Sequence, residues 1–112
     1  MTRESLGEFE QLVLLAIVRL GTDGDVYGVP IVDEIERRTR RSVARAAVYV
    51  TLRRLEQKGL VESWMSDPTD ERGGKARRCV KLTRAGAQTL RESRHAIDQM
   101  WSGLDPKLKE IR

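Results

Sequence analysis

Residues 6–20 predict an α-helix that is apolar on nearly every side, and no other feature restricts the possible folds as strongly. The apolar positions that follow helical spacing are Phe9, Leu12, Val13, Leu15, Ala16 and Ile17. Leu14 and Val18 fill the side that would ordinarily be polar, so this helix must be covered on more than one face. A chain of 112 residues forms a single small domain. One such domain cannot cover both faces by itself.

Two shorter helices are predicted after a turn at residues 22–25. The first covers residues 30–40, with Pro30 in its first turn, where the missing N–H of proline is tolerated. The second covers residues 45–58 and stops at Gly59, which suits a left-handed C-cap. The inward positions of this helix, the third of the chain, are Ala47, Val48, Leu52 and Leu55.

A β-hairpin and a fourth helix complete the predicted order. Residues 60–65 and 77–82 have the composition of two strands, and the polar loop between them contains Pro68 and a Gly-Gly pair. Thr83 is placed to cap a helix over residues 84–102.

Three helices followed by a hairpin are the order of a winged helix-turn-helix. The expected fold is mainly α-helical with a small β-hairpin wing, plus a C-terminal dimerisation helix. The expected boundaries are residues 1–82 for the winged DNA-binding domain, 83–104 for the dimerisation helix and 105–112 for a short charged tail. The same order occurs in protein-docking modules, so a winged-helix protein-interaction module without DNA binding is the alternative interpretation.

Positive charge is concentrated in the middle of the chain. Residues 1–36 hold 2 basic and 8 acidic side chains, residues 37–81 hold 13 and 5, and residues 82–112 hold 6 and 4. Within the middle block, the arginines gather in the third predicted helix and around the hairpin tip. These are the two elements with which a winged helix touches DNA, so the distribution favours nucleic-acid binding over a solvated charged surface.

Five pieces of the sequence resemble the PadR family of bacterial transcriptional regulators in order and spacing. They are Leu6-Gly7-Glu8-Phe9-Glu10; Tyr27-Gly28; Ala47-Val48-Tyr49 with Leu52-Arg53-Arg54-Leu55-Glu56 and Lys58-Gly59-Leu60-Val61; Gly73-Gly74-Lys75; and Leu82-Thr83-Arg84-Ala85-Gly86. The resemblance covers residues 6–104 and is to the compact subgroup with a single C-terminal helix. It implies a homodimeric DNA-binding protein, usually a repressor. Its third helix would enter the major groove, its wing would lie along the backbone or minor groove, and its C-terminal helix would dimerise.

The residues expected to contact double-stranded DNA lie on the third helix and the wing. Arg45, at the front of the helix, is best placed to reach a base edge. Tyr49 lies one turn later beside Arg53 and can donate to a phosphate, and Thr51 is a weaker candidate. Arg53 is favoured over Arg54 because adjacent helical residues diverge by about 100°. On the wing, the expected contacts are Arg72, Gly73, Gly74, Lys75 and Arg77.

Dimerisation is expected through the first and fourth helices, because a winged domain has little core left for the apolar side of the fourth. The residues expected in this interface are Phe9, Leu12, Val13, Leu90, Ile97, Met100, Trp101 and Leu104. Two recognition helices about 34–36 Å apart would then read a pseudo-palindromic operator. Some compact relatives bind flat aromatic ligands between the dimerising helices. Met100 and Trp101 could line a site for such a small aromatic effector, although residues of this kind more often form dimer core.

Other classes of protein are disfavoured. The longest apolar run, residues 12–18, is far shorter than the about 20 residues that cross a bilayer, and the acidic N-terminus is unlike a signal peptide. A cytoplasmic protein is therefore expected. One cysteine, Cys79, and one histidine, His95, provide no metal site and no catalytic set, so neither an enzyme nor a cofactor is expected. RNA binding is a less favoured interpretation, because the aromatic residues on which bases would stack are sparse.

Overall fold

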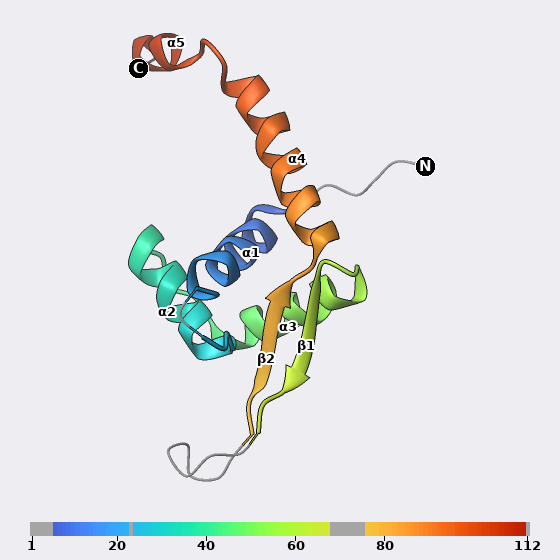
Figure 1. Ribbon diagram of the computed structural model, residues 1–112. Coiled ribbons are helices and arrows are strands. Elements are labelled where there is room, and N and C mark those ends of the chain that lie inside the picture. The colour runs from blue at the N-terminus through green and yellow to red at the C-terminus, as the bar shows by residue number, and fades with distance from the viewer. Residues whose placement is uncertain (1–5, 23, 68–75, 112) are drawn as a thin grey trace.

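The computed structural model describes residues 6–22, 24–67 and 76–111. The elements, in chain order, are α1 (Glu8–Leu20), α2 (Gly28–Thr39), α3 (Arg45–Gln57), β1 (Val61–Met65), β2 (Arg78–Leu82), α4 (Arg84–Trp101) and α5 (Asp105–Glu110), as Figure 1 shows. This order confirms the mainly α-helical winged helix-turn-helix with a C-terminal helix. No helix among the described residues combines the length and the apolar character that a membrane span requires.

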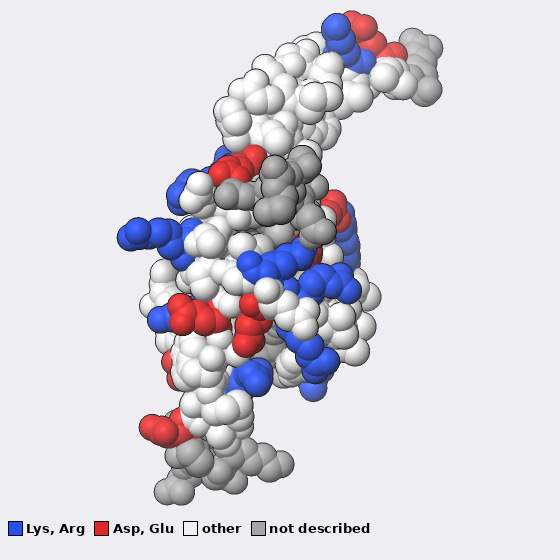
Figure 2. Space-filling model, turned by 90° about the vertical axis from the view of Figure 1, so that its right-hand side faces the viewer, with Lys and Arg blue, Asp and Glu red and all other residues white. Residues whose placement is uncertain are grey.

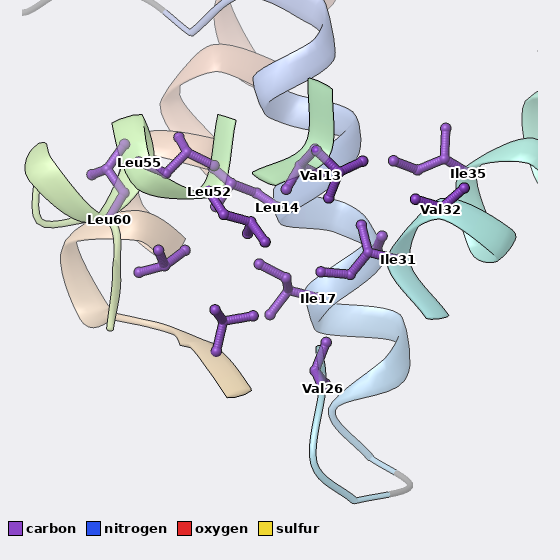
Figure 3. Close-up of a cluster of buried hydrophobic side chains, with 14 of the residues drawn as sticks. Val13, Leu14, Ile17, Val26, Ile31, Val32, Ile35, Leu52, Leu55 and Leu60 are labelled. Atoms are coloured by element: carbon purple, nitrogen blue, oxygen red, sulfur yellow. The ribbon is translucent and has the colours of Figure 1, made fainter. Parts of the chain in front are cut away.

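α1 lies at the centre of the fold and contacts α2, α3, β2 and α4. Val13, Leu14 and Ile17 are buried in the core, where they meet side chains from the other helices (Figure 3). Leu15 and Val18 remain exposed at 44% and 48%. One chain therefore leaves part of this helix uncovered, as its sequence predicts. The uncovered side differs from the expected one, because Leu14 faces the core and Leu15 takes its place.

The remaining core is supplied by one face of each surrounding element. The buried apolar residues outside α1 are Leu6, Val26, Ile31, Val32, Ile35, Val48, Leu52, Leu55, Leu60, Val61, Cys79 and Val80. The four inward positions predicted for α3 include Ala47, which is exposed instead. α2 begins at Gly28 rather than at Pro30. Pro30 is tolerated in the first turn because no intrahelical hydrogen bond requires its missing N–H there.

The turn between α2 and α3 is held by side chains of α2. Arg40 ends α2 in the left-handed conformation at φ 59°, and the Glu36 carboxylate accepts a hydrogen bond from the Val43 amide at 2.8 Å. α3 then starts at Arg45, as predicted, and its N-cap residue Ala44 provides no side-chain hydrogen bond. The recognition helix is thus oriented by the turn before it rather than by a capping hydroxyl.

α3 ends in a Schellman motif, and this confirms the predicted stop at Gly59. Gly59 adopts φ 77°, its amide donates to Glu56 at 2.9 Å, and the Leu60 amide donates to the Leu55 carbonyl at 3.0 Å. Leu55 and Leu60 are both buried, which adds the apolar contact typical of this motif. The chain therefore turns directly from α3 into β1.

The hairpin pairs β1 and β2 antiparallel, with Val61 opposite Leu82 and Met65 opposite Arg78. The Val80 amide donates to the Val26 carbonyl at 2.8 Å, so the connection between α1 and α2 lies alongside β2. This bridge attaches the base of the wing to the helical part of the domain.

α4 is capped as predicted, because the Thr83 hydroxyl accepts a hydrogen bond from the Gly86 amide at 3.0 Å. The helix then projects away from the winged domain (Figure 1). The segment expected to form the short charged tail contains the short helix α5 at Asp105–Glu110. Asp105 and Pro106 lie in its first turn, where an acidic residue and a proline both favour helix initiation.

Candidate nucleic-acid interface

Ion pairs divide the basic residues of the middle block into two groups. The buried carboxylate of Glu34 binds both Arg37 and Arg38, and Arg41 binds Glu8 of α1. The hydrogen bonds to these arginines lower the pKa values of Glu34 and Glu8, so both carboxylates stay ionised near neutral pH. These two carboxylates therefore offset two of the three positive charges on Arg37, Arg38 and Arg41 within the chain.

Lys58, which follows α3, binds Glu10 of α1 at 3.0 Å. Burial raises the pKa of Glu10 and is the largest single influence on it. The Gly7 amide, the Lys58 ammonium and the Arg54 charge together outweigh burial, so the pKa of Glu10 lies below its ordinary value. Because Arg54 acts on Glu10, it lies on the side of α3 that faces α1.

The opposite side of α3 presents Arg45, Tyr49 and Arg53 to solvent. Within the described part of the chain, neither Arg45 nor Arg53 forms an ion pair. The prediction for Thr51 is corrected here. Thr51 is only 6% exposed, because it shares the inward side of α3 with Val48, and it is too deep to touch DNA.

A groove runs between α3 and the wing. Its lining residues are Tyr49, Leu52, Arg53, Glu56, Gln57, Arg78 and Val80. Glu56, the acidic residue among them, accepts a hydrogen bond from the Ser63 hydroxyl at 2.6 Å, and Ser63 accepts one from Arg78 at 2.9 Å. The negative charge of Glu56 is thus held against β1, and the two arginines provide the cationic lining.

A second hollow continues from this groove toward the start of α2. It is lined by Tyr27, Gly28, Val29, Tyr49, Arg77 and Arg78. Tyr49 and Arg78 line both hollows, so the outward side of α3 and the base of the wing form one continuous surface. Of the predicted wing contacts, Arg77 lies on this surface, whereas Arg72, Gly73, Gly74 and Lys75 lie outside the described residues.

The residues of this surface that were absent from the predicted DNA contacts include Tyr27, Gly28 and Arg78. The sequence identifies the Tyr27-Gly28 pair only through the family resemblance, which implies no role for it. Arg78 belongs to the basic segment of the returning strand. Its position beside Tyr49 depends on the packing of the hairpin against α3, which no local pattern reveals.

Apolar side chains cover much of the projecting part of the molecule. Ile97, Met100, Trp101 and Leu104 are exposed on α4 and just after it, and the surface of α4 is largely uncharged on the face shown in Figure 2, where charged side chains gather at α5. Leu108 of α5 and Ile111 of the final segment are further exposed apolar residues, and neither is among the residues predicted for the dimer interface.

The other residues predicted for the dimer interface serve the core of a single chain. Val13 is fully buried, and Phe9, Leu12 and Leu90 pack against the same core. Val13 faces inward because α1 is surrounded by α2, α3 and β2 on that side, whereas Phe9, Leu12 and Leu90 are half-buried at the edge of the core. The part of α1 that remains free for a partner is the one with Leu15 and Val18.

Comparison with known proteins agrees with this architecture. Residues 14–92 match the model of the transcriptional regulator PadR-like family. The transcriptional regulator Rv3488 of Mycobacterium tuberculosis is 34% identical over 96 residues, which cover 83% of each chain. A PadR-like transcriptional regulator from Bacillus cereus has a similar fold, with a TM-score of 0.72, 18% identity and coverage of 92% of this chain and 93% of that one.

A PadR family transcriptional regulator from Eggerthella lenta is similar in sequence as well as in fold. Its TM-score is 0.68 at 26% identity, with coverage of 94% of this chain and 88% of that one. The family match spans well over half of the sequence and includes α2, α3, the hairpin and the first half of α4. The chain therefore belongs to the PadR-like family of transcriptional regulators.

Proposed function

We propose that this protein is a homodimeric repressor that binds a pseudo-palindromic operator in double-stranded DNA with sequence specificity. One observation carries the proposal: the continuous surface that joins the outward side of α3 to the base of the wing. Tyr49 and Arg53 of α3 line this surface with Arg77 and Arg78 of the hairpin, and Arg45 is exposed one turn before Tyr49 on α3. Phosphates attract guanidinium groups that have no carboxylate partner. Among the described residues, this surface presents such groups on two elements, α3 and the hairpin, that can reach one duplex.

Each side chain has a role that follows from its position. Arg45 is at the first position of α3, the end of a recognition helix that points into the major groove, so we assign it to a base edge. Tyr49 and Arg53 lie one and two turns further along, and we assign them to phosphates. Arg77, together with Arg72, Gly73, Gly74 and Lys75 of the hairpin loop, is assigned to the backbone or minor groove beside the wing.

Dimerisation is supported by the uncovered apolar side chains. Ile97 and Met100 of α4 are 52% and 74% exposed, and they lie on a long helix that leaves its own domain. A second copy placed about a twofold axis would cover this stripe and the free side of α1 together. We assign Met100 and Trp101 to the core of that interface rather than to a site for an aromatic effector.

The experiment is a selection of binding sites from a pool of random-sequence duplexes. We expect enrichment of an inverted repeat whose half-sites are about one helical turn apart, and repression of a reporter gene when the selected site overlaps its promoter. The proposal of specific recognition is wrong if the pool shows no enrichment. A protein that also binds no duplex at low salt would instead favour an interaction module.

A further inference from the structure

The Tyr27-Gly28 pair, at the start of α2, touches both DNA-facing elements. The guanidinium carbon of Arg77 lies 4.2 Å from the centroid of the Tyr27 ring, in a cation–π contact. The next residue, Gly28, lies under the Tyr49 ring, since a β-carbon at this position would be 2.6 Å from the ring atom Cε1 of Tyr49. Two consecutive residues therefore contact one side chain of the wing and one of the recognition helix.

The backbone on both sides of the Tyr27–Arg77 contact is fixed. Val26, immediately before Tyr27, is joined to Val80 by the 2.8 Å hydrogen bond that bridges the α1–α2 connection to β2. At the end of the hairpin, the Arg77 amide donates to the Ser66 hydroxyl at 3.0 Å, and the Arg77 carbonyl accepts from the Ser66 amide at 2.7 Å. The remaining freedom at this point belongs to the long Arg77 side chain.

We propose that Tyr27 is a positioning residue of the DNA-binding surface, whose ring holds the Arg77 guanidinium at a fixed place beside Tyr49. An arginine side chain loses conformational freedom when it binds a phosphate, and this loss weakens binding. A ring that already holds the guanidinium in the free protein reduces the loss. Tyr27 thus strengthens the wing contact through Arg77 without needing to touch the nucleic acid. The proposal rests on the proposed DNA-binding function.

The first measurement uses the free protein, so it does not depend on DNA. A cation above an aromatic ring lies in the ring's shielding region, so the side-chain protons of Arg77 should resonate upfield of those of exposed arginines. We expect Tyr27→Phe to keep this shift, because the ring remains, and Tyr27→Leu to abolish it. An unchanged Arg77 shift in Tyr27→Leu would show that the ring does not hold the guanidinium and would overturn the proposal.

The second measurement is a double-mutant cycle on binding to a mixed-sequence duplex of about 30 base pairs at low salt. Tyr27→Leu should weaken binding about three- to fivefold, and Tyr27→Phe should recover most of the loss. In the Arg77→Ala background, Tyr27→Leu should have no further effect, because the group that it positions is gone. Thermal unfolding of each variant verifies that the fold is intact.

The outcomes separate the two levels of inference. The positioning role would be overturned if the affinity losses caused by Tyr27→Leu and Arg77→Ala multiplied in the double variant. It would also be overturned if Tyr27→Phe lost as much affinity as Tyr27→Leu. Neither result would contradict DNA binding. Wild-type affinity in Arg77→Ala would likewise overturn it, because the positioned group would not be a DNA contact. Absence of binding by the wild-type protein would overturn the proposed function itself.

Discussion

Gly86, in the first turn of α4, lies against the carbonyl group of Leu60, so closely that a β-carbon on Gly86 would be 2.1 Å from the carbonyl oxygen. The same carbonyl accepts a hydrogen bond from the Thr83 amide at 3.1 Å, and the Thr83 hydroxyl donates to the neighbouring Gly59 carbonyl at 2.7 Å. The start of α4 is therefore fixed on the turn that follows α3. This contact sets the direction in which the projecting helix leaves the domain.

Gly86→Ala should destabilise the protein strongly. The added methyl group meets backbone rather than a movable side chain, so the structure must shift, and we expect a loss of about 2–3 kcal/mol in the free energy of unfolding. Denaturant unfolding followed by circular dichroism measures it. Gln88→Ala, on the exposed side of the same helix, is the control and should change the value by less than about 0.5 kcal/mol. Equal stability of the two variants would mean that α4 does not pack on Leu60.

Gly28→Ala, unlike Gly86→Ala, should cause only a small loss of stability, but it should cause a large loss of DNA affinity. The atoms nearest to the added β-carbon belong to the end of the Tyr49 ring, and Tyr49 is 49% exposed and can swing outward. Binding to duplex DNA, measured by fluorescence anisotropy, should then fall to the level of Tyr49→Ala. In a Tyr49→Ala background the glycine substitution should cost no further affinity, and an additional loss there would place the role of Gly28 elsewhere.

Arg45, Arg53 and Arg54 should differ in what they contribute to DNA binding. Arg45→Ala should relax the preference for one base pair of the selected site, at a cost of about 1–3 kcal/mol. Arg53→Ala should weaken binding to all sequences and reduce the slope of log affinity against log salt by about one. Arg54→Ala is the matched control, because Arg54 lies on the α1 side of the same helix. Titrations at several salt concentrations would reject this orientation of α3 if Arg54→Ala had the largest effect.

The combination of Ile97→Arg and Met100→Arg should convert the proposed dimer into a folded monomer, because two charges per chain would be buried in its interface. Light scattering gives the mass and circular dichroism verifies the helical content. Leu90 is left unchanged, since it packs against the core of its own chain.

The control for this pair adds the same charges to the opposite side of α4. His95→Arg with Gln99→Arg alters two exposed polar positions of the same helix and should leave the dimer intact. A dimer that persists with both arginines at 97 and 100 would place the interface elsewhere.

The Glu10–Lys58 pair predicts a pH dependence of stability. The pKa of Glu10 is lowered in the folded protein, so its contribution is complete above the pKa of the unfolded chain, near 4.5, and is lost as the pH falls through the lower folded value. Glu10→Gln should therefore be less stable than wild type at pH 7 and should approach it in acid. Urea unfolding at a series of pH values from 7 down into acid measures the difference in stability between Glu10→Gln and wild type, with Glu110→Gln as an exposed control. Parallel stability curves for wild type and Glu10→Gln would contradict the prediction.

The order of elements could be predicted because the signals that decide it are local. Helical spacing, the Thr83 cap and the left-handed Gly59 each act within a few residues of the chain. Predictions that depended on which way a side chain faces were less accurate. Thr51 and Val13 were assigned to outer surfaces and are buried, because neighbouring elements cover those sides of α3 and α1.

The sequence by itself determined a winged helix-turn-helix with a concentration of arginine in its middle. Only the tertiary structure decided which arginines remain available for DNA. Glu8 and Arg41 are 33 residues apart, and Glu10 and Lys58 are 48 apart, so these pairs form only when α1 packs beside the other helices. The folded chain neutralises those basic residues and leaves Arg45 and Arg53 exposed. Folding also brings Tyr27 to Arg77 and Gly28 to Tyr49, because a side-chain contact depends on distance in space rather than on separation along the chain.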